Sequence, residues 1–140
     1  MSSFWRMWFT LWCASLGVFG LVLAGGGLEA TSGPVRLILS LLHGGGPLNF
    51  DQPLRFSLAV LGAVSFGWAV TIYRMIGAAI DLKGAGRPIW NAITAGMISW
   101  FVIDSTLSVA TGFALNVVPN IALAGMYLIG LMGSGALKQP

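Results

Sequence analysis

The chain has few charged residues and almost no cysteine. Only 8% of its 140 residues are charged, whereas a soluble domain carries about 25%. The chain has seven Lys and Arg and four Asp and Glu, for a net charge of +3. No two basic residues are adjacent in the sequence, so it does not indicate a nucleic-acid partner. The single cysteine, Cys13, excludes an intrachain disulfide, a C-x-x-C redox pair and a cysteine zinc set.

Apolar residues and glycine are abundant instead. Hydrophobic residues make up 56% of the chain, and 20 positions are glycine. Because so few charges cannot cover the surface of a soluble globule, this composition predicts an integral membrane protein whose main solvent is lipid. The length allows one domain, so residues 1–140 are expected to form a single transmembrane domain in the lipid bilayer.

Four apolar segments are long enough to cross a hydrocarbon core about 30 Å thick as helices. The predicted spans cover about residues 7–28, 56–80, 89–115 and 120–137. The first is rich in aromatic residues, which favours a retained span over a cleaved signal peptide. Only a short connection separates the last two, so these are expected to pair as a tight hairpin. The predicted fold class is an all-α membrane protein, a four-transmembrane-helix antiparallel bundle.

The loop between the first two spans is expected to contain a short helix over about residues 34–42. Thr31 or Ser32 is a suitable N-cap, and Pro34 is tolerated in a first turn. This segment is too short to span a bilayer, so an interfacial helix is predicted, with a re-entrant helix as the alternative. Residues 43–46 (His-Gly-Gly-Gly) are expected to end it, since glycine adopts left-handed conformations readily.

The distribution of basic residues predicts the orientation. Short cytoplasmic loops of membrane proteins gather Lys and Arg. One predicted side has two basic residues, and the other has five: Arg6, Arg74, Lys83, Arg87 and Lys138. We therefore expect a multi-pass protein of the bacterial inner (plasma) membrane with cytoplasmic N- and C-termini.

Asp104 is the sharpest candidate site residue, because a carboxylate near the middle of a membrane helix is costly and needs polar partners. Ser108 and Thr111 follow at helical spacing and extend one polar face. If the hairpin turns near residues 117 and 118, Asp104 lies opposite residue 131 and Ser108 opposite Tyr127. The sequence thus predicts a polar intramembrane cluster of Asp104, Ser108, Thr111 and Tyr127, with Asp104 bonded to Ser108 or Tyr127 and not to Arg74.

Two roles are open for this cluster. Its side chains can hold helices together through interhelical hydrogen bonds, or Asp104 can take up and release a proton during transport. An enzymatic alternative would use the glycines after His43 as an oxyanion hole in lipid processing, but the nucleophile motif G-x-S-x-G is absent. No catalytic residue, metal site or cofactor is predicted.

Small residues and tryptophans also form patterns. Small residues spaced by four predict close helix packing. Trp5, Trp8 and Trp90 lie near predicted cytoplasmic ends, as in an aromatic belt, whereas Trp68 and Trp100 are expected in the core. The small-residue pairs are Gly20 with Ala24, Ala63 with Gly67, Ala92 with Gly96, Ser108 with Gly112, and Gly130 with Ser134.

The stretch Trp100-Phe101-Val102-Ile103-Asp104-Ser105, continuing through Ser108, Thr111-Gly112 and Asn116 to Asn120, resembles small uncharacterised four-span inner-membrane proteins of proteobacteria. The resemblance is strongest over residues 90–125. It implies a four-span fold and no activity. Residues and resemblance together favour a non-catalytic membrane protein that acts by helix–helix contact, as an accessory or assembly subunit with a membrane-protein partner or as a homo-oligomer. The alternative is a small proton-coupled transporter that uses Asp104.

Overall fold

The computed structural model describes residues 1–45 and 48–138, and within them it contains helices and turns but no strand. Four helices are long: α1 (Ser3–Ala24), α3 (Gln52–Asp81), α4 (Arg87–Ala110) and α5 (Val117–Gly133). Together with adjoining helical turns, each is long and apolar enough to cross a membrane. The all-helical fold and its four long apolar helices are thereby confirmed.

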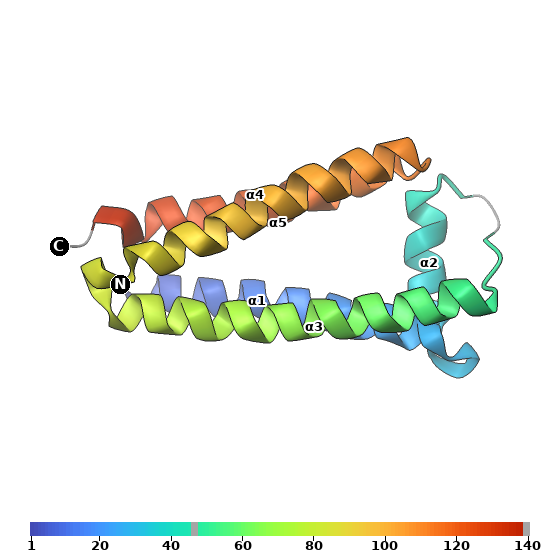
Figure 1. The fold of residues 1–140 in the computed structure, drawn as a ribbon, viewed down its shortest axis with the longest axis horizontal. Helices are drawn as coiled ribbons and strands as arrows, with labels where there is room; N and C mark the ends of the chain where they lie inside the picture. The colour runs from blue at the N-terminus through green and yellow to red at the C-terminus, as the bar shows by residue number, and fades with distance from the viewer. Residues whose placement is uncertain (46–47, 139–140) are drawn as a thin grey trace.

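The helices form two pairs, α1 with α3 and α4 with α5 (Figure 1). Helix α1 also contacts α5, and α3 contacts α4, so each long helix has two neighbours. Both termini lie at one end, and the two pairs diverge toward the other end, where α2 (Gly33–Leu42) runs across the bundle (Figure 1). Short 3₁₀ turns connect these elements.

Glycine allows α1 and α3 to approach closely. A Cβ atom added to Gly20 would lie 2.7 Å from the backbone N of Phe66, and one added to Gly62 would lie 2.5 Å from the carbonyl O of Gly20. The predicted small-residue contact at Gly20 is therefore confirmed. At Gly67 and Gly96 it is wrong, because an added Cβ meets nothing within 4 Å among the described residues.

The main core lies in the half of the bundle near the termini, where all four long helices meet. Phe9 and Trp12 of α1 contact Tyr127 of α5, with ring centroids 6.5 and 5.5 Å apart, and Phe9 also contacts Trp90 of α4. The belt position predicted for Trp90 is wrong: its side chain is 1% exposed inside this core. Trp68 is half-buried and packs beside this core.

Helix α2 confirms the short helix predicted in the first loop. Val35 is fully buried against Leu23 of α1 and Leu58 of α3 in a second, smaller core. The predicted side-chain cap is wrong, because the Ser32 hydroxyl donates to the carbonyl O of Glu29 (3.0 Å) and accepts from Nε of Arg36 (3.0 Å) instead.

The glycines after α2 end it as predicted. The helix stops at Leu42, and Gly44 and Gly45 have φ of 75° and 91°. This is the left-handed region, which glycine adopts without steric cost. Gly46, the last residue of the predicted helix stop, lies outside the described residues.

The turn between α4 and α5 comes earlier than predicted. Helix α4 ends at Ala110 rather than near residue 115, because Gly112 takes a φ of 88°. The backbone N of Phe113 then donates to the carbonyl O of Ser108 at 2.7 Å, which closes the helix end. Helix α5 begins at Val117 with Pro119 in its first turn, where a missing N–H breaks no helical hydrogen bond.

Candidate functional site

Asp104 lies near one end of α4 rather than in its middle. It precedes the last residue of the helix, Ala110, by six positions, which is about 9 Å at about 1.5 Å per residue. This part of the hairpin lies at the end of the bundle crossed by α2 (Figure 1). The prediction of a mid-span carboxylate assumed a helix running to residue 115, so the early turn at Gly112 corrects it.

Two asparagines from the far side of the turn bind the Asp104 carboxylate. Nδ2 of Asn120 donates to Oδ2 at 2.6 Å, and Nδ2 of Asn116 donates to the same oxygen at 3.2 Å. The two amides also reach hydroxyls of α4: Asn116 donates to Oγ of Ser108 at 2.9 Å and Asn120 to Oγ of Ser105 at 3.2 Å. These five residues are called the Asp104 cluster below.

The Asp104 cluster lies between α4 and α5. Asn120 and Ser108 are buried, whereas Asp104, Ser105 and Asn116 are half-buried. Every member comes from the α4–α5 hairpin, so the carboxylate is bound by its own hairpin and not by α1 or α3. In a membrane these hydrogen bonds hold α4 and α5 together, because without them the polar side chains would face hydrocarbon unpaired.

The structure brings two of the four residues of the predicted cluster together. Asp104 and Ser108 are brought together through Asn116, which donates to both. Thr111 is exposed, and its hydroxyl donates to the carbonyl O of Leu107 at 2.7 Å. The prediction that Ser108 or Tyr127 binds the carboxylate directly is wrong, because its donors are the two asparagines.

Tyr127 lies in the main core, away from Asp104. Its hydroxyl is 2.7 Å from Oγ1 of Thr94 and 3.5 Å from the carbonyl O of Trp90. The physical reason is the register of the hairpin: Asp104 faces residue 120 rather than residue 131, a difference of 11 positions. The salt bridges between described residues include neither Arg74 nor Asp104.

Sequence reasoning missed Asn116 and Asn120 because it placed the first in the turn and the second at the very start of the last span. They are four positions apart, so on a continuous helical stretch their side chains share one face. The signal that could have found them is Gly112 after Thr111, a pattern typical of a helix C-terminus. With the turn placed there, the two amides fall opposite Ser108 and Asp104.

The end of α2 covers the tip of this hairpin. The rings of His43 and Phe113 have centroids 5.0 Å apart, and α2 contacts the 3₁₀ turn Ala114–Asn116. No group of three or more His, Cys, Asp or Glu that could hold a metal ion occurs within residues 1–45 and 48–138. The immediate partners of Asp104 are the amides of Asn116 and Asn120, which bind a carboxylate but do not titrate near neutral pH.

A separate group of charges fixes α2 to the start of α3. The Glu29 carboxylate pairs with Arg36 at 3.1 Å and with the guanidinium of Arg55. The guanidinium of Arg36 lies 4.0 Å from the centre of the Phe50 ring, a cation–π distance. Nε of Arg55 donates to the carbonyl O of Phe50 at 3.1 Å. Both arginines therefore have structural contacts at this end of the bundle.

No protein-family model matches the chain, and neither a curated protein nor a solved structure is significantly similar to it. The resemblance of residues 90–125 to four-span proteins of proteobacteria therefore stays an expectation. Function has to follow from the chemistry of the site and of the exposed surfaces, because a helical bundle by itself supports many functions.

Proposed function

We propose that this chain is a non-catalytic integral membrane protein that acts by helix–helix contact, as an accessory or assembly subunit of a membrane complex. Its surroundings are the lipid bilayer of the bacterial inner membrane, with both termini in the cytoplasm. The termini lie at one end of the bundle (Figure 1). Arg6, near the start of α1, and Arg74 of α3 line the same hollow. This placement supports the orientation that the positive-inside rule predicts.

The outer half of the α4–α5 hairpin is the observation that carries this proposal. Among the described residues, the two hydrophobic cores include no α4 residue after Trp100 and no α5 residue before Leu123. The hairpin diverges from α1 and α3 over this part (Figure 1). Large apolar side chains are exposed along it: Val102, Ile103, Leu107, Val109, Val118 and Ile121.

The Asp104 cluster joins the two helices of this outer half through hydrogen bonds that lie within the hairpin. Amide–carboxylate and amide–hydroxyl bonds join α4 to α5 close to the turn. A helix pair that is already joined loses little conformational freedom when a partner binds it, which favours association. Within a membrane, association then depends on packing and interhelical hydrogen bonds, since lipid and protein are equally apolar. The hairpin therefore suits a partner made of transmembrane helices.

Site-specific photo-crosslinking in native membranes tests this proposal. A photoreactive amino acid at Val102, Ile103 or Ile121 should form an adduct with a protein. The same probe at Val60 or Val64, which are exposed on α3, serves as the matched control and should form none. Two differently tagged copies of the chain distinguish a second copy from another protein in the adduct. Absence of adducts at all three hairpin positions, with a lone monomer after mild extraction, would overturn the proposal.

A small proton-coupled transporter that uses Asp104 is the second candidate. The half-buried carboxylate in a helix that is apolar enough to cross a membrane is the observation that favours it. Transport requires a proton to leave the side chain, so Asp104→Asn should then fold normally yet abolish pH-driven flux in proteoliposomes, and Asp104→Glu should retain it. If the hairpin is a contact surface, the adducts at Val102 should persist in Asp104→Asn.

A further inference from the structure

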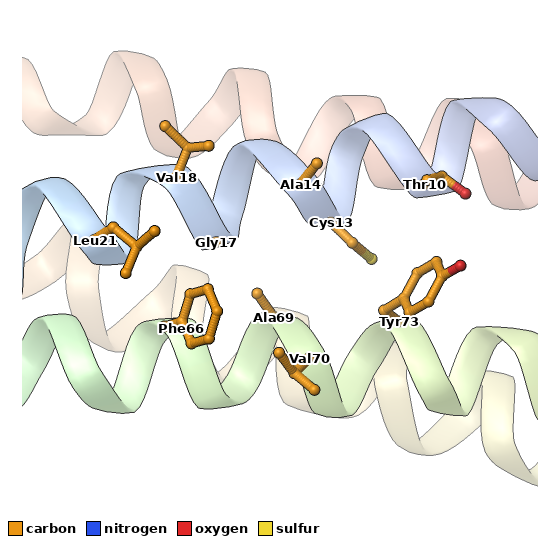
Figure 2. A pocket seen from close by; sticks show the side chains of 10 residues that line it. All are labelled: Thr10, Cys13, Ala14, Gly17, Val18, Leu21, Phe66, Ala69, Val70 and Tyr73. Carbon is orange, nitrogen blue, oxygen red and sulfur yellow. The ribbon is translucent and has the colours of Figure 1, made fainter.

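A groove between α1 and α3 opens on the outside of the bundle, on a different face from the α4–α5 hairpin. Its volume is about 320 Å³. Figure 2 shows the small residues Cys13, Gly17 and Ala69 along the groove, with Phe66 and Leu21 at one end. A Cβ atom at Gly17 would lie 3.7 Å from the Phe66 ring, so the glycine keeps the groove open there. The lining is almost entirely apolar.

Toward the termini this groove continues into a second hollow of about 480 Å³. Thr10 and Tyr73 line both, so the two hollows adjoin along α1 and α3, and together they are called the depression below. The second hollow is partly polar, and its lining includes Arg6, Arg74 and Asp81. The whole depression is therefore amphipathic along its length, apolar in its inner part and charged at its end.

The dimensions match one leaflet of a bilayer. Leu21 follows Thr10 by eleven positions, and this corresponds to about 16 Å at about 1.5 Å per residue. Half of a hydrocarbon core about 30 Å thick is about 15 Å. An acyl chain that starts at Thr10 and lies along the groove would thus reach Leu21.

The charges at the end of the groove leave one positive charge available. Arg6 and Asp81 approach each other to 3.8 Å. Arg74 takes part in none of the salt bridges between described residues. The three side chains together carry a net charge of +1, which complements the single negative charge of a phosphodiester. Arginine suits this ligand because its planar group can donate two parallel hydrogen bonds to phosphate.

We infer that this depression binds one anionic phospholipid of the phosphatidylglycerol type, with an acyl chain in the α1–α3 groove and the phosphate at Arg74 and Arg6. The uncharged glycerol headgroup leaves the lipid with one negative charge, which the net +1 of the site neutralises. The inference goes beyond the proposed subunit function and is independent of it, since the two surfaces lie on different helix pairs.

Native mass spectrometry of the purified protein, with equal amounts of phosphatidylglycerol, phosphatidylethanolamine and phosphatidylcholine, tests this inference. One phosphatidylglycerol should be retained in preference to the other two lipids. Arg74→Gln should weaken its retention about tenfold or more, because hydrogen bonds to charged groups are among the strong ones. Arg87→Gln is the matched control, since Arg87 is exposed at the same end but lines neither hollow, and it should leave retention unchanged.

The acyl part of the site needs its own variants. Gly17→Leu should fill the groove and weaken retention, whereas Gly96→Leu, at a glycine of α4 with open space around it, should not. Val70→Trp fills the groove from α3 and replaces Gly17→Leu if that variant fails to fold. Equal retention of the three lipids, preference for phosphatidylethanolamine, or identical losses in Arg74→Gln and Arg87→Gln would each overturn the inference. Crosslinking at Val102 should be the same in Arg74→Gln as in the unaltered chain.

Discussion

Replacing Asp104 measures how much free energy of unfolding the Asp104 cluster contributes by joining α4 to α5. Asp104→Asn keeps an acceptor oxygen for the two asparagine amides, and Asp104→Leu removes it. In Asp104→Leu, Asn116 retains the Ser108 hydroxyl and Asn120 retains the Ser105 hydroxyl. The loss is therefore two hydrogen bonds of about 0.6 kcal/mol each in a membrane, or about 1.2 kcal/mol of unfolding free energy. Asp104→Asn should cost less than about 1 kcal/mol.

A double-mutant cycle separates this interaction from changes in hydrophobicity, since leucine is also more apolar than aspartate. Asp104→Leu, Asn120→Leu and the double variant should give a coupling energy of about 0.6 to 1.7 kcal/mol. Thr106, exposed two positions along α4, supplies the control, and Thr106→Leu should show no coupling to Asn120→Leu. The assay is SDS-driven unfolding in mixed micelles, followed by tryptophan fluorescence. Zero coupling between Asp104 and Asn120 would refute the hydrogen-bond argument.

Three further outcomes follow from other contacts. Gly62→Ala should destabilise the fold by about 1 to 3 kcal/mol in the same unfolding assay, because the added methyl forces α1 and α3 apart, whereas Gly67→Ala should change stability by less than about 1 kcal/mol. Tyr127→Phe should cost about 0.6 kcal/mol and show coupling to Thr94→Val, since the hydroxyls share one hydrogen bond. Glu29→Gln should accelerate hydrogen exchange in α2 alone, because it weakens the ion pairs that attach α2 to α3.

The four long helices could be predicted because one quantity, the length of an apolar segment, identifies each of them. A helix that crosses a hydrocarbon core needs about 20 apolar residues, and four segments of the sequence meet this requirement within a few residues of the observed bounds. The short helix in the first loop was also predictable, because Pro34 and the glycines after His43 bound it. Proline at a helix start and glycine at a helix end are reliable local signals, since they depend on backbone preference and not on tertiary packing.

The register of the last hairpin could not be predicted from apolar length, because residues 111–116 carry no charge and include Phe113, Ala114 and Leu115. A turn inside an apolar stretch is marked only by its conformation, here the positive φ of Gly112. Moving the turn changes every partner across the hairpin, so Tyr127 was paired with the wrong residues and Asn120 was overlooked. The burial of Trp90 could not be predicted either, since a tryptophan near a helix end can lie in an interfacial aromatic belt or in the buried core.

The Asp104 carboxylate is bound by residues of its own hairpin. Its donors lie 12 and 16 positions away along the chain, so α4 and α5 can satisfy this carboxylate as soon as the hairpin forms. The hairpin then needs α1 and α3 only near the termini, where Trp12 donates to the carbonyl O of Leu123 at 3.0 Å. An outer half whose polar bonds lie within the hairpin could exchange lipid for a partner helix without disturbing the main core. This separation of the main core from a hairpin that binds its own carboxylate favours a contact function over one that requires the whole bundle to move.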